Sequence, residues 1–164
     1  MKEVREQLAA VLAADPANPS ALIWLATLDE GKLTAEVARA AARGAPSDHA
    51  GWLSLSSLTN DPAEKESALR KAVALGPDCA TCNNNLAWLL VQSNRAKDAL
   101  PYANRAVDLA PWDGTFIDTL ATVAAGLGKC EEALRLEARA VRISGGQAAI
   151  KQQLEVIKSR CEKR

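Results

Sequence analysis

Two consecutive segments of the chain repeat each other at a constant offset of 34 residues. The first, residues 80–113, reads ATCNNNLAWLLVQSNRAKDALPYANRAVDLAPWD, and the second, residues 114–147, reads GTFIDTLATVAAGLGKCEEALRLEARAVRISGGQ. Without a gap they match at Leu86/Leu120, Ala87/Ala121, Ala99/Ala133, Leu100/Leu134, Arg105/Arg139, Ala106/Ala140 and Val107/Val141. A fixed period of this length is typical of stacked repeats, in which each repeat is one supersecondary unit.

The composition favours helices as the repeated element. Hydrophobic residues, largely Ala and Leu, make up 48% of the 164-residue chain, whereas aromatic residues make up 4%. Small side chains of high helix propensity favour closely packed helices over a sheet. The formal charge is zero, with 20 basic and 20 acidic residues, so we expect no field that would attract nucleic acid or an anionic membrane. With no apolar run of about 20 residues, we expect no membrane insertion.

A Pro or Gly follows the predicted N-terminal helix and each predicted helix pair. Such residues mark helix ends, since Pro cannot continue a helix and Gly commonly ends one. These residues are Pro16, Pro46, Pro77, Pro111 and Gly145. They divide a single domain into an N-terminal helix (1–18), four helix pairs (19–48, 49–79, 80–113 and 114–147) and a capping helix (148–164). The predicted helices are Lys2–Ala14, Pro19–Asp29, Thr34–Arg43, Ser47–Leu58, Pro62–Leu75, Ala80–Gln92, Ala96–Leu109, Thr115–Ala125, Cys130–Ile143 and Gln147–Cys161.

The repeats resemble the tetratricopeptide repeat, whose pattern is W-x2-L-G-x2-Y, then A-x3-F, then Pro. Its Leu-small pair is present as Leu25-Ala26, Leu55-Ser56, Leu86-Ala87 and Leu120-Ala121, and Trp52 matches its Trp. Glu137 departs from the pattern, which has an aromatic residue there, and Gly145 replaces the last Pro. The resemblance implies an all-α, right-handed α-α superhelix (solenoid) of about four helix pairs, with an N-terminal half-repeat and a C-terminal cap. The alternative is another helical solenoid.

In that family the first helices of the repeats line a concave groove that binds a peptide or a partner protein. By that resemblance the groove comprises Ile23, Thr27, Leu53, Ser57, Thr81, Asn84, Asn85, Trp88, Asp118 and Thr122. None of these residues is Lys or Arg, so we do not expect the grip on a C-terminal carboxylate that one branch of the family uses. Asn84 and Asn85 could bind a peptide backbone and Trp88 could be a hot spot. Alternatively, the Asn residues are only the polar start of a helix, and Trp88 packs on a neighbouring repeat. Trp24 and Trp112 are predicted to be structural.

The four cysteines fall into two pairs. Cys79 and Cys82 form a C-x-x-C at a helix start, without the His that haem attachment needs or further ligands for zinc. A local disulfide or two free thiols remain open for this pair. Cys130 and Cys161 lie at the far ends of two predicted helices, of 14 and 15 residues, that fold back antiparallel, so both thiols should lie at one end. We predict a Cys130–Cys161 disulfide, the alternative being two buried free thiols.

The sequence therefore predicts a non-enzymatic interaction module or adaptor, without cofactor or metal, that binds a protein or peptide. It carries no phosphate-binding Gly-rich motif, and its single His, His49, lies at a predicted helix start. One alternative is a structural assembly module that packs through helix edges, as a homo-oligomer for example. Another is a thiol or metal accessory using Cys79 and Cys82. Formation of the disulfides would indicate an extracytoplasmic protein whose signal lies outside this chain, and their absence a cytoplasmic one.

Overall fold

The described part of the chain is helical in both of its compact units. The computed structural model describes residues 2–15, 18, 20–21, 24, 35–44 and 46–162. The units are Met1–Pro77 and Asp78–Arg164, so the division falls at the end of the second predicted helix pair. No β-strand occurs among the described residues, and no described helix has both the length and the hydropathy that crossing a bilayer requires.

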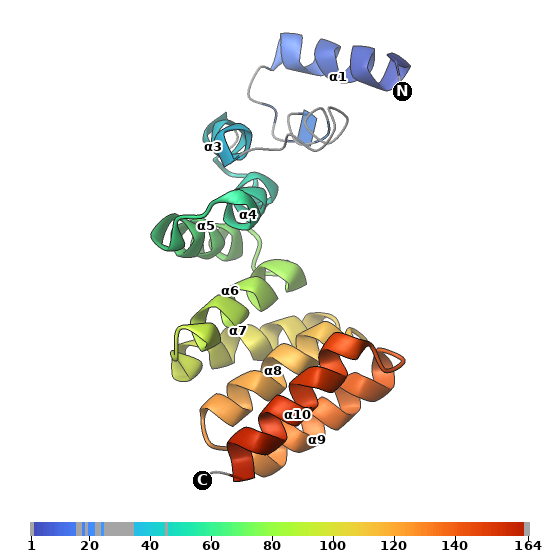
Figure 1. Ribbon diagram of the computed structural model, residues 1–164. Helices are drawn as coiled ribbons and strands as arrows, with labels where there is room; N and C mark the ends of the chain where they lie inside the picture. Colours follow the sequence, from blue (N-terminus) through green and yellow to red (C-terminus); the bar gives the residue numbers. More distant parts are fainter. Residues whose placement is uncertain are drawn as a thin grey trace. The chain divides into compact units, whose positions relative to one another are not determined.

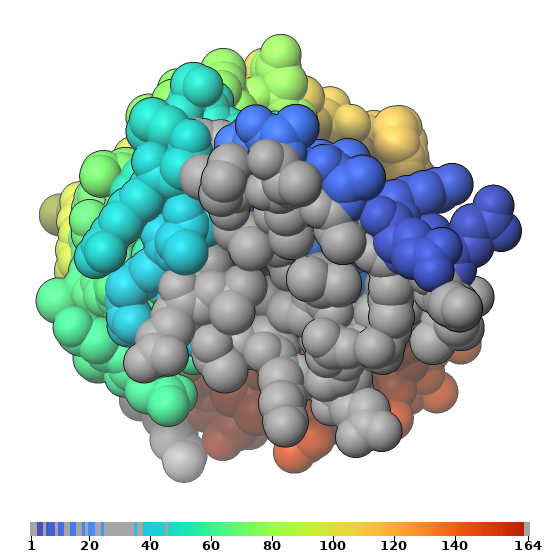
Figure 2. Space-filling view, turned by 90° about the horizontal axis from the view of Figure 1, so that it is seen from above, coloured from blue at the N-terminus to red at the C-terminus, as the bar shows by residue number. Residues whose placement is uncertain are grey.

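The first unit contains helices α1 (Lys2–Ala14), α3 (Ala35–Gly44), α4 (His49–Leu58) and α5 (Pro62–Leu75) (Figure 1). Helix α4 packs against both α3 and α5, and their contact is built on Ala38, Leu55 and Ala68. The carboxylates of Asp48 and Asp61 accept hydrogen bonds from the first turns of α4 and α5, as N-caps do. Seen from above, α1 and α3 lie at the surface of this unit (Figure 2).

The second unit contains the two strict repeats and the cap. Helices α6 (Ala80–Gln92) and α7 (Ala96–Leu109) form one antiparallel pair, and α8 (Gly114–Gly126) and α9 (Cys130–Ile143) form the next. Helix α8 packs on both α6 and α7, while α10 (Ala148–Glu162) packs on α8 and α9 (Figure 1). The last three helices meet in a core of small and β-branched residues: Ala121, Ala124, Ala125, Ala133 and Ile157. Small side chains allow the close helix approach that the repeat requires.

The turn inside each strict repeat has the same backbone conformation. Asn94 has φ of 58° and Gly128, one period later, has φ of 81°. This left-handed region suits Gly, and Asn tolerates it better than other residues with a side chain. The 34-residue period therefore extends to the conformation of the turn as well as to the buried positions.

Two equivalent arginines tie each strict repeat to the loop that precedes it. Arg105 of α7 forms an ion pair with Asp78, and Arg139 of α9 donates to the Pro111 carbonyl oxygen at 2.8 Å. In both repeats the arginine thus reaches the loop that precedes the first helix of its own repeat.

The observed helix boundaries agree with the predicted ones to within two residues wherever both are described. The predicted helix Pro19–Asp29 lies mostly outside the described residues. The structural role predicted for Trp24 and Trp112 is wrong, since their exposed fractions are 61% and 72%. Trp112 follows the helix-ending Pro111 in a short loop, where neighbouring helices do not cover its ring.

Candidate functional site

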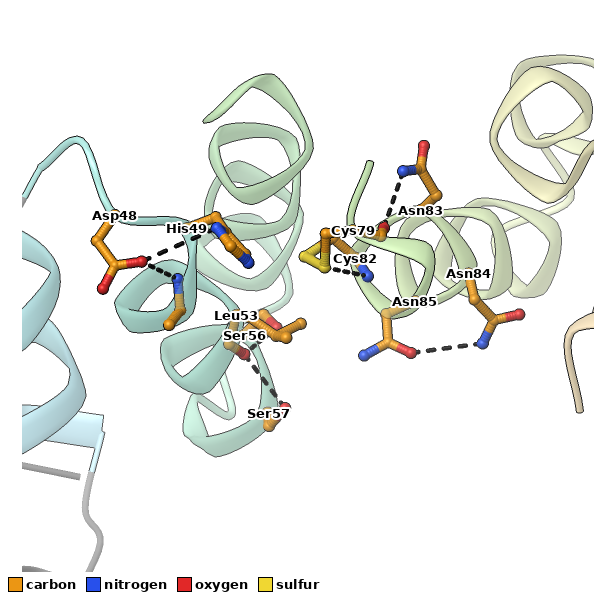
Figure 3. Close-up of a disulfide and its surroundings, with 11 residues drawn as sticks. Asp48, His49, Leu53, Ser56, Ser57, Cys79, Cys82, Asn83, Asn84 and Asn85 are labelled. Carbon is orange, nitrogen blue, oxygen red and sulfur yellow. Dashed lines mark hydrogen bonds and ion pairs between the residues drawn. A yellow bond between two sulfur atoms is a disulfide. The ribbon is translucent and has the colours of Figure 1, made fainter. Parts of the chain in front are cut away.

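Helix α6 begins at a disulfide and presents polar residues from its first turns. Cys79 is the N-cap, its Sγ accepting a hydrogen bond from the Cys82 backbone N–H at 3.1 Å, and the two sulfurs are bonded with Cα atoms 5.2 Å apart. The sulfur pair and the Asn residues that follow it are drawn in Figure 3. Because the sulfurs are joined to each other, this pair offers no free thiolate for metal binding in the disulfide form.

The predicted binding residues of α6 differ in accessibility. Thr81 is exposed, Asn85 is half-buried and Trp88 has 39% of its surface exposed. Asn84 is 7% exposed, and its Nδ2 donates to Asn85 Oδ1 at 3.5 Å. The Oδ1 atom of Asn84 points away from Asn85 (Figure 3) and has no hydrogen-bond partner. Trp88 thus provides accessible apolar area, while Asn84 provides an unsatisfied acceptor beneath the surface.

Asp118 of α8 occupies the position of Asn84 one repeat later, and it lies against Glu137 of α9. Asp118 is half-buried, whereas Glu137 is 0% exposed. Neither carboxylate can donate a hydrogen bond, and Asp118 Oδ1 and both Glu137 oxygens have no donor facing them. We call the surface formed by Thr81, Asn84, Asn85, Trp88 and Asp118 the α6/α8 face.

Burial changes the protonation of this carboxyl pair. It raises the pKa of Glu137 to about 8, and the charge and hydrogen bonding of Asp118 raise it further in the same direction. Burial also raises the pKa of Asp118, while hydrogen bonding from Glu137 opposes that change. At neutral pH Glu137 therefore retains a proton, which it can donate to Asp118.

Thr122, which was predicted to line the same surface, is covered. It is 6% exposed, and its Oγ1 accepts a hydrogen bond from Gln153 Nε2 of α10 at 2.9 Å. The capping helix packs against α8 where a further repeat would, and it occupies this position. Thr122 is therefore outside the α6/α8 face.

Two of the predicted binding residues of the first unit are described. Leu53 is half-buried and Ser57 is exposed, with Ser57 Oγ donating to the Leu53 carbonyl oxygen at 3.3 Å. Ile23 and Thr27 lie outside the described residues. The residue that sequence reasoning did not include is Glu137, although its departure from the repeat pattern was the available signal.

The predicted pairing of the other two cysteines agrees with the structure. Cys130, at the start of α9, is bonded to Cys161, near the end of α10, with Cα atoms 5.6 Å apart. Cys161 also packs against the core of the last three helices. The bond therefore fastens the free end of the cap to the repeat beneath it.

The first unit contains a small cavity of about 240 Å³, lined by Arg39, Arg43, Trp52, Leu55, Glu64, Ser67 and Ala68. Arg39 binds both Glu64 oxygens, at 2.5 and 2.8 Å. These bonds, and one from the Thr59 hydroxyl, lower the pKa of Glu64 to about 2. The volume lies below the roughly 300–1,000 Å³ of typical ligand pockets, and Arg39 and Glu64 in its lining are paired with each other. The ion pair is structural.

Comparison with solved structures identifies the architecture. YrrB, whose crystal structure is described as a TPR protein with an unusual peptide-binding site, superposes with a TM-score of 0.76 at 20% identity, over 98% of this chain and 86% of that one. The fold is that of a tetratricopeptide repeat protein. The thermophilic TPR protein TTC0263 of Thermus thermophilus superposes with a TM-score of 0.67 at 19% identity, over 93% and 88% of the two chains.

MamA from Desulfovibrio magneticus RS-1 has the same tetratricopeptide repeat fold, with a TM-score of 0.66 at 17% identity over 99% of this chain and 87% of that one. The sequence matches no protein-family model and no curated protein. At these identities the similarity is one of architecture.

Proposed function

We infer that this protein is a non-enzymatic interaction module that binds a segment of a partner protein on the α6/α8 face. The observation that carries the proposal is Trp88, a large aromatic side chain left 39% exposed beside the half-buried Asn85. An aromatic anchor beside amide donors and acceptors is suited to bind a side chain and a peptide backbone together. The peptide-binding site named for YrrB supports the same class of function.

The test is capture of partners from cells of the source, with the wild type compared with Trp88→Ala and Asn85→Ala. The matched control is Trp112→Ala, because Trp112 is a still more exposed indole of the same unit and lies in the loop between α7 and α8, outside the set of residues that defines the α6/α8 face. We expect the α6 variants to lose the partner and the Trp112 variant to retain it. Equal capture by all three variants would reject this face as the binding surface.

Assembly through the capping helix is a second candidate. The outer side of α10 leaves Val156 52% exposed, in a shallow surface with Gln152, Glu155, Ser159 and Arg160. Sedimentation of the wild type and of Val156→Lys distinguishes the two functions. A dimer that the substitution dissociates would favour assembly, and a monomer in both cases would leave partner binding as the function.

The two disulfides support an extracytoplasmic location, since such bonds persist in oxidising compartments. Cys79–Cys82 and Cys130–Cys161 together use all four cysteines of the chain. Alkylation of the protein in intact cells, followed by mass spectrometry with and without reductant, tests this proposal. Four alkylated cysteines without reductant would indicate a reducing compartment.

A further inference from the structure

The unsatisfied polar atoms of the described core share one chemical character. They are Asn84 Oδ1, Asp118 Oδ1, Glu137 Oε1 and Glu137 Oε2. All four are oxygen acceptors, and all belong to the second unit. Buried polar atoms normally have a partner, so a group of acceptors without donors needs an explanation.

The positions of these atoms in the repeat relate them to the α6/α8 face. Asn84 and Asp118 are 34 residues apart and therefore equivalent in α6 and α8, and these two helices pack directly on each other. Glu137 lies behind Asp118, against which its carboxyl group is placed. Asp118 is half-buried as a residue, although its unpartnered Oδ1 is buried, while Asn84 and Glu137 are more than nine-tenths buried.

Protonation alone does not satisfy this group. A proton on Glu137 lets it donate to Asp118, but Asn84 Oδ1 and the second Glu137 oxygen still lack a donor. Both side chains of the pair are acidic, and no residue of the α6/α8 face is Lys or Arg. On α8, Asp118 is the acidic group that lies against Glu137. On α10, the neutral side chain of Gln153 donates a hydrogen bond to Thr122 of α8.

A donor-rich cation would supply the donors that these oxygens lack. An ammonium group has three N–H donors and a guanidinium has five, and neither has an acceptor. A guanidinium can bind a carboxylate through two parallel hydrogen bonds. The exposed ring of Trp88, one helical turn after Asn84, can cover the aliphatic stem of such a side chain or attract its charge.

We propose that the α6/α8 face recognises a Lys or Arg side chain of the bound segment, with Asp118 as its first contact and with Glu137 and Asn84 as the acceptors behind it. This inference rests on the proposed function. It adds that the partner is a peptide segment with a basic residue, and it assigns Glu137 a role in specificity.

The probe is a set of acetylated and amidated dodecapeptide pools without other basic residues, in which one central position is fixed as Arg, Lys, Ala or Glu. Retention of each pool on the immobilised full-length protein is measured by mass spectrometry. We expect the Arg and Lys pools to be retained about tenfold more than the Ala pool, which corresponds to about 1.4 kcal/mol. The Glu pool should be retained least.

Asp118→Asn and Glu137→Gln should reduce this preference to less than about twofold. The matched controls are Asp108→Asn and Glu131→Gln, which remove the same charge at exposed positions of α7 and α9 and should retain the preference. Circular dichroism checks that each variant is folded, and Glu137→Gln is expected to fold well because it removes a buried ionisable group.

Three results would overturn the inference. Equal retention of the four pools by the wild type, with all of them lost in Trp88→Ala, would leave peptide binding in place and reject recognition of a basic residue. A preference that survives in both carboxyl variants would place recognition elsewhere. Retention of no pool above the level of Trp88→Ala would reject peptide binding on this face and the inference with it.

Discussion

Replacing Glu137 by Gln should remove a pH dependence of stability that the buried carboxyl pair creates. Glu137 is 0% exposed, and its pKa is raised from an ordinary 4.5 to about 8. Between these pH values the folded chain holds a proton that the unfolded chain has released. The free energy of unfolding therefore falls with rising pH, by about 1.4 kcal/mol per pH unit for one proton. The stability that Glu137 contributes through its bound proton is fully present below pH 4.5 and is lost as the pH rises to about 8.

The full effect is on the order of 3–5 kcal/mol, a large part of the 5–15 kcal/mol that stabilises a typical domain. Urea unfolding at a series of pH values measures it in the wild type and in Glu137→Gln. The difference between the two curves cancels the titration of other carboxylates, such as Glu64. We expect the variant to gain stability over the wild type steadily from pH 4.5 to 8. Glu131→Gln, at an exposed position of the same helix, should show no such trend.

The titration of Glu137 can also be followed directly through the ¹³C shift of its carboxyl carbon. In Asp118→Asn the pKa should fall but stay above 4.5, because burial is the larger cause and the Asp118 charge the smaller one. A Glu137 carboxyl that titrates near 4.5 in the wild type would refute the reasoning. So would a flat difference curve between the wild type and Glu137→Gln.

Three further predictions concern the fold. In urea unfolding under oxidising conditions, Cys161→Ser should lower the free energy of unfolding by about 4 kcal/mol and Cys82→Ser by about 2 kcal/mol. The reason is that the two bonds close loops with sequence separations of 31 and 3. Equal losses of stability would contradict this loop-entropy account. Glu64→Gln should remove stability that the wild type has above pH 4.5 and loses as the pH falls to about 2, because Arg39 lowers the pKa of Glu64; identical acid unfolding of both proteins would count against it. Asn94→Val should lower the melting temperature by the equivalent of about 1–2 kcal/mol, since a β-branched residue is strained at φ of 58°, and an unchanged temperature would show that the turn relaxes.

Most of the fold could be predicted because its signals are local. Asp61 with Pro62 starts α5 as an N-cap and first-turn proline do, and the recurring Pro and Gly residues mark the ends of helix pairs. The pairing of Cys130 with Cys161 followed from two helices of nearly equal length folding back on each other. Such features depend on spacing along the chain, which the sequence contains in full.

The candidate site was predicted less completely, because accessibility depends on neighbours distant in sequence. The repeat register placed Asn84, Trp88 and Thr122 on one surface, but only Trp88 is substantially exposed. Thr122 is covered because α10 packs on α8 and Gln153 reaches it. A repeat pattern describes one unit and does not include the helix that ends the stack.

The sequence by itself predicted the helices, their period and the pairing of Cys130 with Cys161, because helix propensity, capping and helix length act over a few residues. The tertiary structure alone decided that Asp118 and Glu137 would share a proton and that four buried oxygens would lack donors. The sequence marked Glu137 as a departure from the repeat pattern. Only packing shows that its pKa is raised, because burial removes water from its carboxyl group and α8 brings the carboxyl group of Asp118 beside it.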